Sequence, residues 1–392
     1  MGQESEMFTF NSPTRLVFGN GVADTAAREI AAIGARKVLI VTGPGRTASS
    51  EALARLKRGL EAEGLTWAHF AGAGADPSTD MVDEGLALYR REGCDSILAY
   101  GGGSPIDCAK GIGAQAGEGR PIRDFIGTGL AFSAPVPPLV ALPTTAGTGS
   151  EVTNAAVFTF MDEGHKVKRG TAGLSLFPRI ALVDPLLQVS MPPELTAATG
   201  MDALTHAVEA YVSRSHNPVA DLFCLESIRL IGENLKRACR HGEDLEARAG
   251  MAQASTLAGV ALSQAGLGMV HGFAHAAGAL GGLAHGLANA ILLPYVMQAC
   301  IPDASMRLAS IGRALTGRHS ATAIDAVAAM ADLGGEIGIP PNLAAAGIPE
   351  DLLGAIFDDA KAYKRRPQSP HAFTDEELKI LLYKAWSENM AE

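Results

Sequence analysis

The stretch SILAYGGGSPIDCAK, residues 96–110, decides the fold of the first half of the chain. It begins as a short apolar run, continues into three consecutive glycines and then opens a helix at Ser104 and Pro105. An apolar strand followed by a glycine turn and a helix is the building unit of parallel α/β sheets. Glycines let the backbone approach an anion closely, and the N-terminus of the next helix offers unpaired N–H groups. The stretch therefore predicts an α/β sheet that carries a phosphate-binding loop.

The same unit repeats on both sides of this stretch. Runs rich in Val, Ile and Leu, with little alternation, predict further buried strands at residues 16–19, 37–43, 138–151 and 180–185. Between the early strands, helical spacing covers residues 23–33, 50–63 and 81–92. Right-handed crossovers connect strands and helices of this kind. We predict a doubly wound, mostly parallel, Rossmann-like α/β domain.

The pattern changes after about Val189. Strand signals disappear, and Ala- and Leu-rich stretches with helical spacing run almost to the end of the chain. The segment SMPPEL, residues 190–195, places prolines where a helix would begin. We therefore predict an α/β domain at residues 1–189 and an all-helical domain at residues 190–392. A ligand site is expected in the cleft between them.

Charge and cysteine content restrict the possible partners. Of the 392 residues, 19% are charged, the net charge is −10, and no Lys/Arg block interrupts this acidic balance, so we expect neither a nucleic-acid nor a membrane partner. Five scattered cysteines without a C-x-x-C pair, and no secretory pattern at the N-terminus, predict a reduced cytoplasmic protein. The stretch between Arg248 and Asp303 has no charged residue apart from histidines. We interpret it as buried helices around a polar site.

A second strand end also has the composition of a phosphate loop. The segment PTTAGTGSE, residues 143–151, places Thr144, Thr145, Thr148 and Ser150 around two glycines. Neither this loop nor the first one is a G-x-G-x-x-G fingerprint or a Walker A motif. Two such loops at the ends of successive strands nevertheless favour a dinucleotide, because ligands of open α/β sheets bind at the carboxyl ends of the strands.

The helical half contains a group of metal-ligand residue types. Asp202 and His206 are four residues apart, which places them on one face of a helix. His271 and His275 have the same spacing, and His285 follows ten residues later in an uncharged, glycine-rich stretch. Neutral imidazole and carboxylate suit Fe(II) or Zn(II), and these residue types do not distinguish the two metals. The pattern predicts a metal site, without deciding which of the histidines bind.

Together, these motifs resemble the signature regions of the iron-containing alcohol dehydrogenases, from about Phe8 to Trp386. The resemblance implies that one Asp and three His hold the metal, and that His275 relays a proton, for which an imidazole that titrates near neutral pH is suited. It also implies that the pyrophosphate lies on the glycine loop and that the threonines, Asp76 and Lys168 contact the coenzyme. The implied ligands are Asp202, His206, His271 and His285; the implied coenzyme residues are Asp76, Gly101, Gly102, Gly103, Ser104, Thr144, Thr145, Thr148 and Lys168. We also expect Gly43 and Asp107, which belong to the same strand ends, to bind the coenzyme.

One position departs from the family pattern. Many NAD-preferring members have Asp directly after the second predicted strand, where this chain has Gly43, followed by Arg46. The coenzyme is therefore expected to be NAD or NADP. The resemblance implies a metal-dependent alcohol dehydrogenase or aldehyde or ketone reductase that transfers hydride to or from a small substrate, and a homo-oligomer.

Three other functions are compatible with parts of this pattern. A metal-free reductase of the same fold, like the maleylacetate reductases, would not need the Asp/His set. A sugar-phosphate cyclase related to dehydroquinate synthase would use NAD and zinc, with a ligand pattern that fits less well. A non-catalytic metal- or nucleotide-binding protein would not need both sites on one cleft.

Overall fold

A six-stranded parallel sheet forms the centre of the N-terminal half. The computed structural model describes residues 7–162 and 164–390. The strand order is β1-β8-β5-β4-β2-β3, and every pair is parallel. The strands are β1 (Arg15–Phe18), β2 (Lys37–Thr42), β3 (Thr66–Phe70), β4 (Ser96–Gly101), β5 (Leu139–Pro143) and β8 (Ile180–Val183). Gly101 pairs with Pro143, so the loops that follow β4 and β5 leave the same edge of the sheet side by side.

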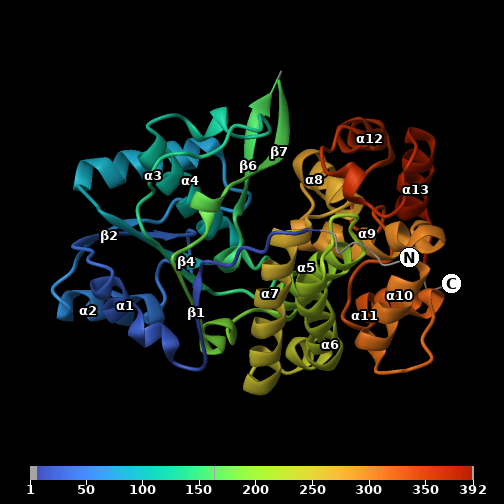
Figure 1. Ribbon diagram of the computed structural model, residues 1–392, viewed down its shortest axis with the longest axis horizontal. Helices are drawn as coiled ribbons and strands as arrows, with labels where there is room; N and C mark the ends of the chain where they lie inside the picture. Colours follow the sequence, from blue (N-terminus) through green and yellow to red (C-terminus); the bar gives the residue numbers. More distant parts are fainter. Residues whose placement is uncertain (1–6, 163, 391–392) are drawn as a thin grey trace.

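Helices cover both faces of this sheet, which explains why its strands are apolar without alternation. On one face, α1 (Ala26–Ala32) and α2 (Glu51–Ala62) pack against a cluster that includes Ile40 and Leu98. On the other face, α3 (Thr79–Glu92) and α4 (Gly103–Glu118) pack against a cluster that includes Leu39 and Ile97. The predicted doubly wound α/β architecture is confirmed (Figure 1).

The sequence patterns did not reveal three strands, and one predicted strand was too long. The edge strand β3 has the sequence TWAHF, whose polar residues hide its strand character. The antiparallel hairpin of β6 (Ala155–Asp162) and β7 (His165–Ala172) carries mostly exposed or partly buried side chains. The strand predicted over residues 138–151 ends at Pro143, because the threonines and glycines that follow form a loop.

Nine α-helices form the rest of the described chain, and no strand follows Val183 before residue 390. The helix α5 is buried on all sides over its second half, where it packs against α6, α7 and α9. Polar side chains on that half of α5 must therefore find partners inside the protein. The helices are α5 (Pro193–Val212), α6 (Pro218–Arg240), α7 (Leu245–Ala265), α8 (Met269–Gly281), α9 (His285–Ala299), α10 (Ile301–Thr316), α11 (Ala323–Glu336), α12 (Leu353–Lys361) and α13 (Asp375–Ser387).

Short 3-10 turns connect these elements. They are Val22–Thr25, Ile122–Asp124, Ser150–Val152, Leu174–Leu176, Pro185–Gln188, Glu350–Leu352 and Arg366–Gln368. The turn at Pro185–Gln188 connects β8 to the first helix of the helical half. The division into domains at residues 189 and 190 stays a prediction.

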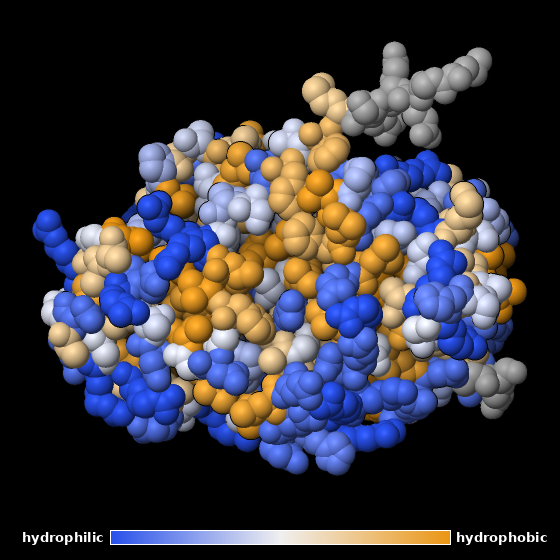
Figure 2. All heavy atoms as spheres, turned by 60° about the horizontal axis from the view of Figure 1, so that its bottom comes forward, coloured by the Kyte–Doolittle hydropathy of each residue, from blue (hydrophilic) through white to orange (hydrophobic). Residues whose placement is uncertain are grey.

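The surface and the uncharged stretch bear on possible membrane contact. Figure 2 shows hydrophobic and hydrophilic side chains mixed on the face that it presents. Exposed large apolar residues include Leu16 and Phe18 of the edge strand β1. Among the described residues, no helix alone has both the length and the apolar composition of a membrane span; α7 and α8 have them only as a pair bent by 107°.

Candidate active site

One cleft lies between the sheet and the helices, and every site residue named from the sequence lines it. Its volume is about 1270 Å³. The sheet contributes the loops that follow β2, β4 and β5, and the helical half contributes the Asp/His group from α5, α8 and α9. The tertiary structure therefore brings the two predicted sites, which lie in different halves of the sequence, into one cleft.

The two predicted phosphate loops pack directly against each other. The glycine loop leads into α4, whose N-cap is Gly102. A Cβ at Gly102 would lie 3.0 Å from the Thr145 hydroxyl oxygen, and a Cβ at Gly103 would lie 2.6 Å from Thr148 Cγ2. Only glycine fits at 103, and the absence of side chains leaves the backbone of both loops open to the cleft. The helix N-terminus there favours an anionic ligand.

Buried charges on α4 fix the threonine loop in this place. The Asp107 carboxylate accepts hydrogen bonds from the Ser150 hydroxyl (2.5 Å) and from Val157 N–H (2.9 Å). The ammonium of Lys110 donates to the Thr153 and Ala155 carbonyls at 2.9 and 2.8 Å. Burial raises the pKa of Asp107 and lowers the pKa of Lys110 to about 8. Asp107 thus holds the loop, and a direct contact of Asp107 with the coenzyme stays a prediction.

Asp76 and Lys168 form an ion pair across the cleft wall. Asp76 lies in the loop after β3, in a left-handed backbone conformation (φ 51°), and Lys168 lies on β7. The Lys168 ammonium donates to the Asp76 carboxylate, and its side chain is buried. A contact of either residue with the coenzyme stays a prediction, but the ion pair holds the two side chains together.

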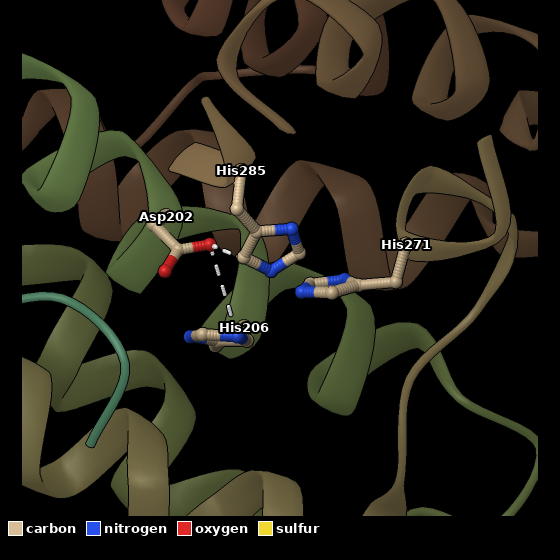
Figure 3. Close-up of side chains that lie close together, drawn as sticks. All are labelled: Asp202, His206, His271 and His285. Carbon is tan, nitrogen blue, oxygen red and sulfur yellow. Dashed lines mark ion pairs between the residues drawn. The ribbon is translucent and has the colours of Figure 1, made fainter. Parts of the chain in front are cut away.

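The four predicted metal ligands converge at one point (Figure 3). One candidate ligand atom from each of Asp202, His206, His271 and His285 lies within 4.8 Å of all the others. Asp202 Oδ1 is 3.8 Å from His206 Nε2 and 3.7 Å from His285 Nε2. Ligand atoms around one tetrahedral ion are separated by about 3.4 Å, given metal–ligand bonds of about 2.1 Å. The group is thus close to the size that a single ion needs.

Neighbouring acceptors orient two of these rings. Glu209 Oε2 lies 2.6 Å from His271 Nδ1, and the Gly147 carbonyl oxygen lies 3.3 Å from His206 Nδ1. Each acceptor favours a proton on Nδ1, which leaves the Nε2 lone pair free for a metal. Burial lowers the pKa of His206 and lowers that of His285 well below its usual value, so both rings are neutral at pH 7, as metal ligands must be.

The side-chain amide of Asn289 lies among the candidate ligand atoms and can donate hydrogen bonds to them. The Asn289 amide nitrogen is 2.7 Å from Asp202 Oδ1, 3.1 Å from His271 Nε2 and 3.3 Å from His285 Nε2. Three acceptors that converge on one N–H₂ group can also converge on a cation. The buried His285 Nδ1 and Asn289 Oδ1 have no hydrogen-bond partner in the described chain. This donor set fits a divalent metal.

His275 lies beside this group and is not part of it. Its ring centroid is 5.4 Å from that of His285 and 5.7 Å from that of Tyr363. Burial, followed by the positive charge of Lys168, holds the pKa of His275 well below its usual value. The proton relay that the resemblance implies for His275 stays a prediction. As a neutral ring, it can pass a proton by accepting on one nitrogen and releasing from the other.

Comparison with known proteins identifies relatives over nearly the whole chain. Residues 13–185 match the model of the iron-containing alcohol dehydrogenases, and residues 196–386 match that of the C-terminal part of the Fe-containing alcohol dehydrogenase family. The 1,3-propanediol dehydrogenase of Klebsiella pneumoniae is 41% identical over 350 residues, which cover 88% of this chain and 90% of that protein. The NAD-dependent methanol dehydrogenase of Bacillus methanolicus is 39% identical over 361 residues, covering 90% and 93%.

Solved structures show the same architecture. A 1,3-propanediol oxidoreductase superposes with a TM-score of 0.92 at 36% identity, covering 97% of this chain and all (100%) of that one. The sulfoacetaldehyde reductase of Bifidobacterium kashiwanohense, solved in complex with NAD+, gives 0.88 at 28% identity, covering 98% and 100%.

The parallel α/β sheet, whose glycine and threonine loops face an Asp/His group across one cleft, belongs to an oxidoreductase, because the relatives over nearly the whole chain are alcohol dehydrogenases. The chain belongs to the iron-containing alcohol dehydrogenase family. It is an alcohol dehydrogenase, and a non-catalytic binding protein is excluded as its function.

Four residues of the site were not found from the sequence. Glu209 lies three positions after His206, and Asn289 lies four positions after His285, so helical spacing could have revealed both. Tyr363 and Arg365 line the cleft from the connection between α12 and α13, far in sequence from the metal motifs. No motif marks them, and only the tertiary structure places them there.

Proposed function

We propose that this alcohol dehydrogenase binds one divalent metal through Asp202, His206, His271 and His285, and a nicotinamide coenzyme along the two sheet loops. The observation that carries the proposal is the convergence of four ligand atoms, all within 4.8 Å of one another, in the cleft that the loops line. Iron is the metal in the name of the family. Zinc is the alternative, because imidazole and carboxylate suit both.

The chain's own residues position the reactants. The loops at Gly101–Ser104 and Thr144–Thr148 hold the coenzyme pyrophosphate, and the ion pair of Asp76 with Lys168 shapes the wall towards the histidines. When bound, the coenzyme supplies the hydride chemistry and the metal supplies a Lewis acid for the substrate oxygen. His275 accepts the alcohol proton during oxidation and passes it out of the buried site, because it lies beside the ligand group without belonging to it.

Substrates of this site are small alcohols and the matching aldehydes or ketones. The relatives are named for 1,3-propanediol, methanol, choline and long-chain alcohols, which differ widely in size and charge. Family membership therefore supports the reaction and leaves the substrate open. The side chains that line the cleft beside the Asp/His group would set the choice.

NADP(H) is proposed as a coenzyme at least comparable to NAD(H). Gly43 directly follows β2 and offers no carboxylate. Arg46, which is exposed, lines the same cleft. An acidic side chain at this place would repel a 2′-phosphate, whereas an arginine accommodates it. The opposite observation is that one relative is named NAD-dependent and one structural relative contains NAD+. Direct comparison of the two coenzymes decides the question.

A homo-oligomer and a cytoplasmic location also remain proposals. The edge strand β1, with Leu16 and Phe18 exposed by 45% and 41%, supports the first, because an unpaired apolar strand edge is prone to pair with another copy.

Metal removal tests the central proposal. Protein stripped by chelation, and confirmed as metal-free by elemental analysis, should lose oxidation of small alcohols followed by the absorbance of the reduced coenzyme. Fe(II), added without oxygen, or Zn(II) should restore turnover. His285→Ala should lose metal and turnover together while it keeps coenzyme affinity, and the exposed His319→Ala is the matched control. Full turnover by the metal-free protein would identify the metal-free reductase type instead.

A further inference from the structure

Two of the cationic side chains that line the cleft have neither an ionic nor a hydrogen-bonding partner among the described residues. Six Lys and Arg residues line it: Arg46, Arg123, Lys168, Arg169, Lys364 and Arg365. Arg123, Lys168 and Arg169 form ion pairs with Asp162, Asp76 and Asp359, and Lys364 donates to a backbone carbonyl. Within residues 7–162 and 164–390, Arg46 and Arg365 have neither an ion pair nor a side-chain hydrogen bond. Arg46 is exposed near β2, whereas Arg365 is partly buried.

Arg365 lies at the metal end of the cleft. Tyr363, two residues before it, packs edge-on against His275. The Arg365 guanidinium lies against the connection between α7 and α8, where a Cβ on Gly266 would be 3.0 Å from Arg365 Nη1. The next residue, Leu267, lines the cleft, and α8 then carries His271 and His275. The charge of Arg365 is close enough to His275 to contribute to lowering its pKa.

We propose that Arg365 binds a carboxylate of the substrate, so that the enzyme prefers aldehydes and alcohols that also carry a carboxylate group. This inference rests on the proposed function, because it places the reacting carbonyl or alcohol oxygen at the Asp/His group. The coenzyme pyrophosphate is assigned to the loops of the sheet, whereas the Arg365 guanidinium lies against Gly266 in the connection between α7 and α8.

Physical chemistry favours a carboxylate at this position. A partly desolvated guanidinium without a counter-charge is costly, and an incoming anion removes that cost. The planar guanidinium matches a carboxylate in a two-point contact, which an ammonium cannot reproduce. A hydrogen bond to a charged group contributes enough to change relative rates by about 10- to 100-fold. Arg169, which also lines the cleft, is not available for such a contact because its guanidinium is bound to Asp359.

Matched aldehyde pairs test this proposal in the metal-loaded enzyme. Glyoxylate is compared with acetaldehyde, and succinate semialdehyde with butanal, so that each pair differs chiefly in the carboxylate. The wild type should show a kcat/KM at least about 10-fold higher for the anionic member of one pair. Arg365→Gln should reduce that ratio about 10-fold or more, and Arg365→Lys should retain part of it. The exposed Arg28→Gln on α1, which lies outside the cleft and has no ion pair with any residue that the structure describes, should keep the wild-type ratio.

An inhibition experiment on the wild type does not depend on any variant folding. Butyrate should compete with butanal more strongly than butyramide does in the presence of coenzyme. Two results would overturn the role of Arg365 and leave the proposed function standing. In the first, the enzyme turns over neutral aldehydes and prefers the anionic member of neither pair. In the second, the anionic preference exists but Arg365→Gln leaves it intact. Loss of turnover with every aldehyde, charged or neutral, would instead contradict the proposed function.

Discussion

Glu209 and His271 are joined by a 2.6 Å contact between Oε2 and Nδ1, although sixty-two residues separate them in the chain. The side chains are only 1% exposed, and the second Glu209 oxygen accepts Val270 N–H at 2.8 Å. The N-cap of α8 is Gly268, which has no side chain to cap the helix. Glu209 therefore caps α8 and at the same time orients the His271 ring. A residue of α5 thus positions a candidate metal ligand that lies on α8.

Replacing Glu209 should weaken metal binding. Glu209→Gln keeps the size but loses the charge and one acceptor, so the His271 ring is less well oriented, and metal affinity should fall about 10- to 100-fold. Competition with a chromophoric chelator measures this independently of turnover. Coenzyme affinity should change little, because Glu209 does not line the cleft. Glu233→Gln on the surface of α6 is the control, and an unchanged metal affinity in Glu209→Gln would refute the role.

His275→Ala should slow catalysis without removing the metal. General acid–base groups contribute about 10²- to 10⁴-fold to turnover, and His275 lies outside the four-residue ligand group. We expect kcat to fall within that range and the pH dependence of kcat to change. Elemental analysis should still find about one metal per chain. Loss of the metal together with activity would make His275 a ligand.

Gly43→Asp should shift the coenzyme preference towards NAD(H). Gly43 is not in a left-handed conformation, and a Cβ there would lie 3.3 Å from the Ala73 carbonyl oxygen, so the aspartate needs only a small adjustment. Its carboxylate would repel a 2′-phosphate. We expect kcat/KM for NADP(H) to fall about 10-fold or more relative to NAD(H), and Arg46→Ala to have a milder effect. A wild type that strongly prefers NAD(H), with a ratio unmoved by Gly43→Asp, argues against a role for this loop.

Gly259→Ala should loosen the coenzyme loop. A Cβ on this α7 residue would lie 2.6 Å from the Gly149 carbonyl oxygen and 2.9 Å from Gly149 Cα, so helix and loop must separate. Overpacking of this kind costs about 1–3 kcal/mol. Thermal unfolding should occur at a lower temperature, and the KM for the coenzyme should rise. Gly335→Ala in α11 is the control, because its Cβ would meet nothing within 4 Å and should stabilise slightly.

His371 should make a pH-dependent contribution to stability. Its hydrogen bond to Asp303 Oδ2, together with Glu377, raises the pKa of His371 above its usual value. A raised folded-state pKa gives stability that is complete below the unfolded-state pKa of about 6.5 and lost as the pH rises through the folded-state value. This partly exposed pair contributes at most about 1 kcal/mol.

The difference in melting temperature between wild type and His371→Gln measures this contribution. We expect about 2 °C or less near pH 6, shrinking as the pH rises above 7. Asp303→Asn should also reduce the pH dependence, because it removes the main partner. A difference that grows with pH would have the wrong sign and would exclude this linkage.

The sequence by itself determined the local units of this protein. The strand, glycine turn and helix at residues 96–110 are confirmed as β4 and α4, and the prolines of SMPPEL precede or begin α5. The spacing of Asp202 and His206 placed both on one face of that helix, and the structure brings them together with His271 and His285. These features depend on backbone geometry over a few residues, so a periodic pattern reveals them.

Only the tertiary structure decided which distant residues meet. The polar strand β3 and the hairpin β6–β7 lack the apolar runs that mark buried strands. They are strands because β3 pairs with β2, and β6 pairs with β7. The contact of Glu209 with His271, the separation of His275 from the ligand group and the position of Arg365 depend on how helices far apart in sequence pack. Packing is set by the whole core at once, so no short stretch of sequence contains it.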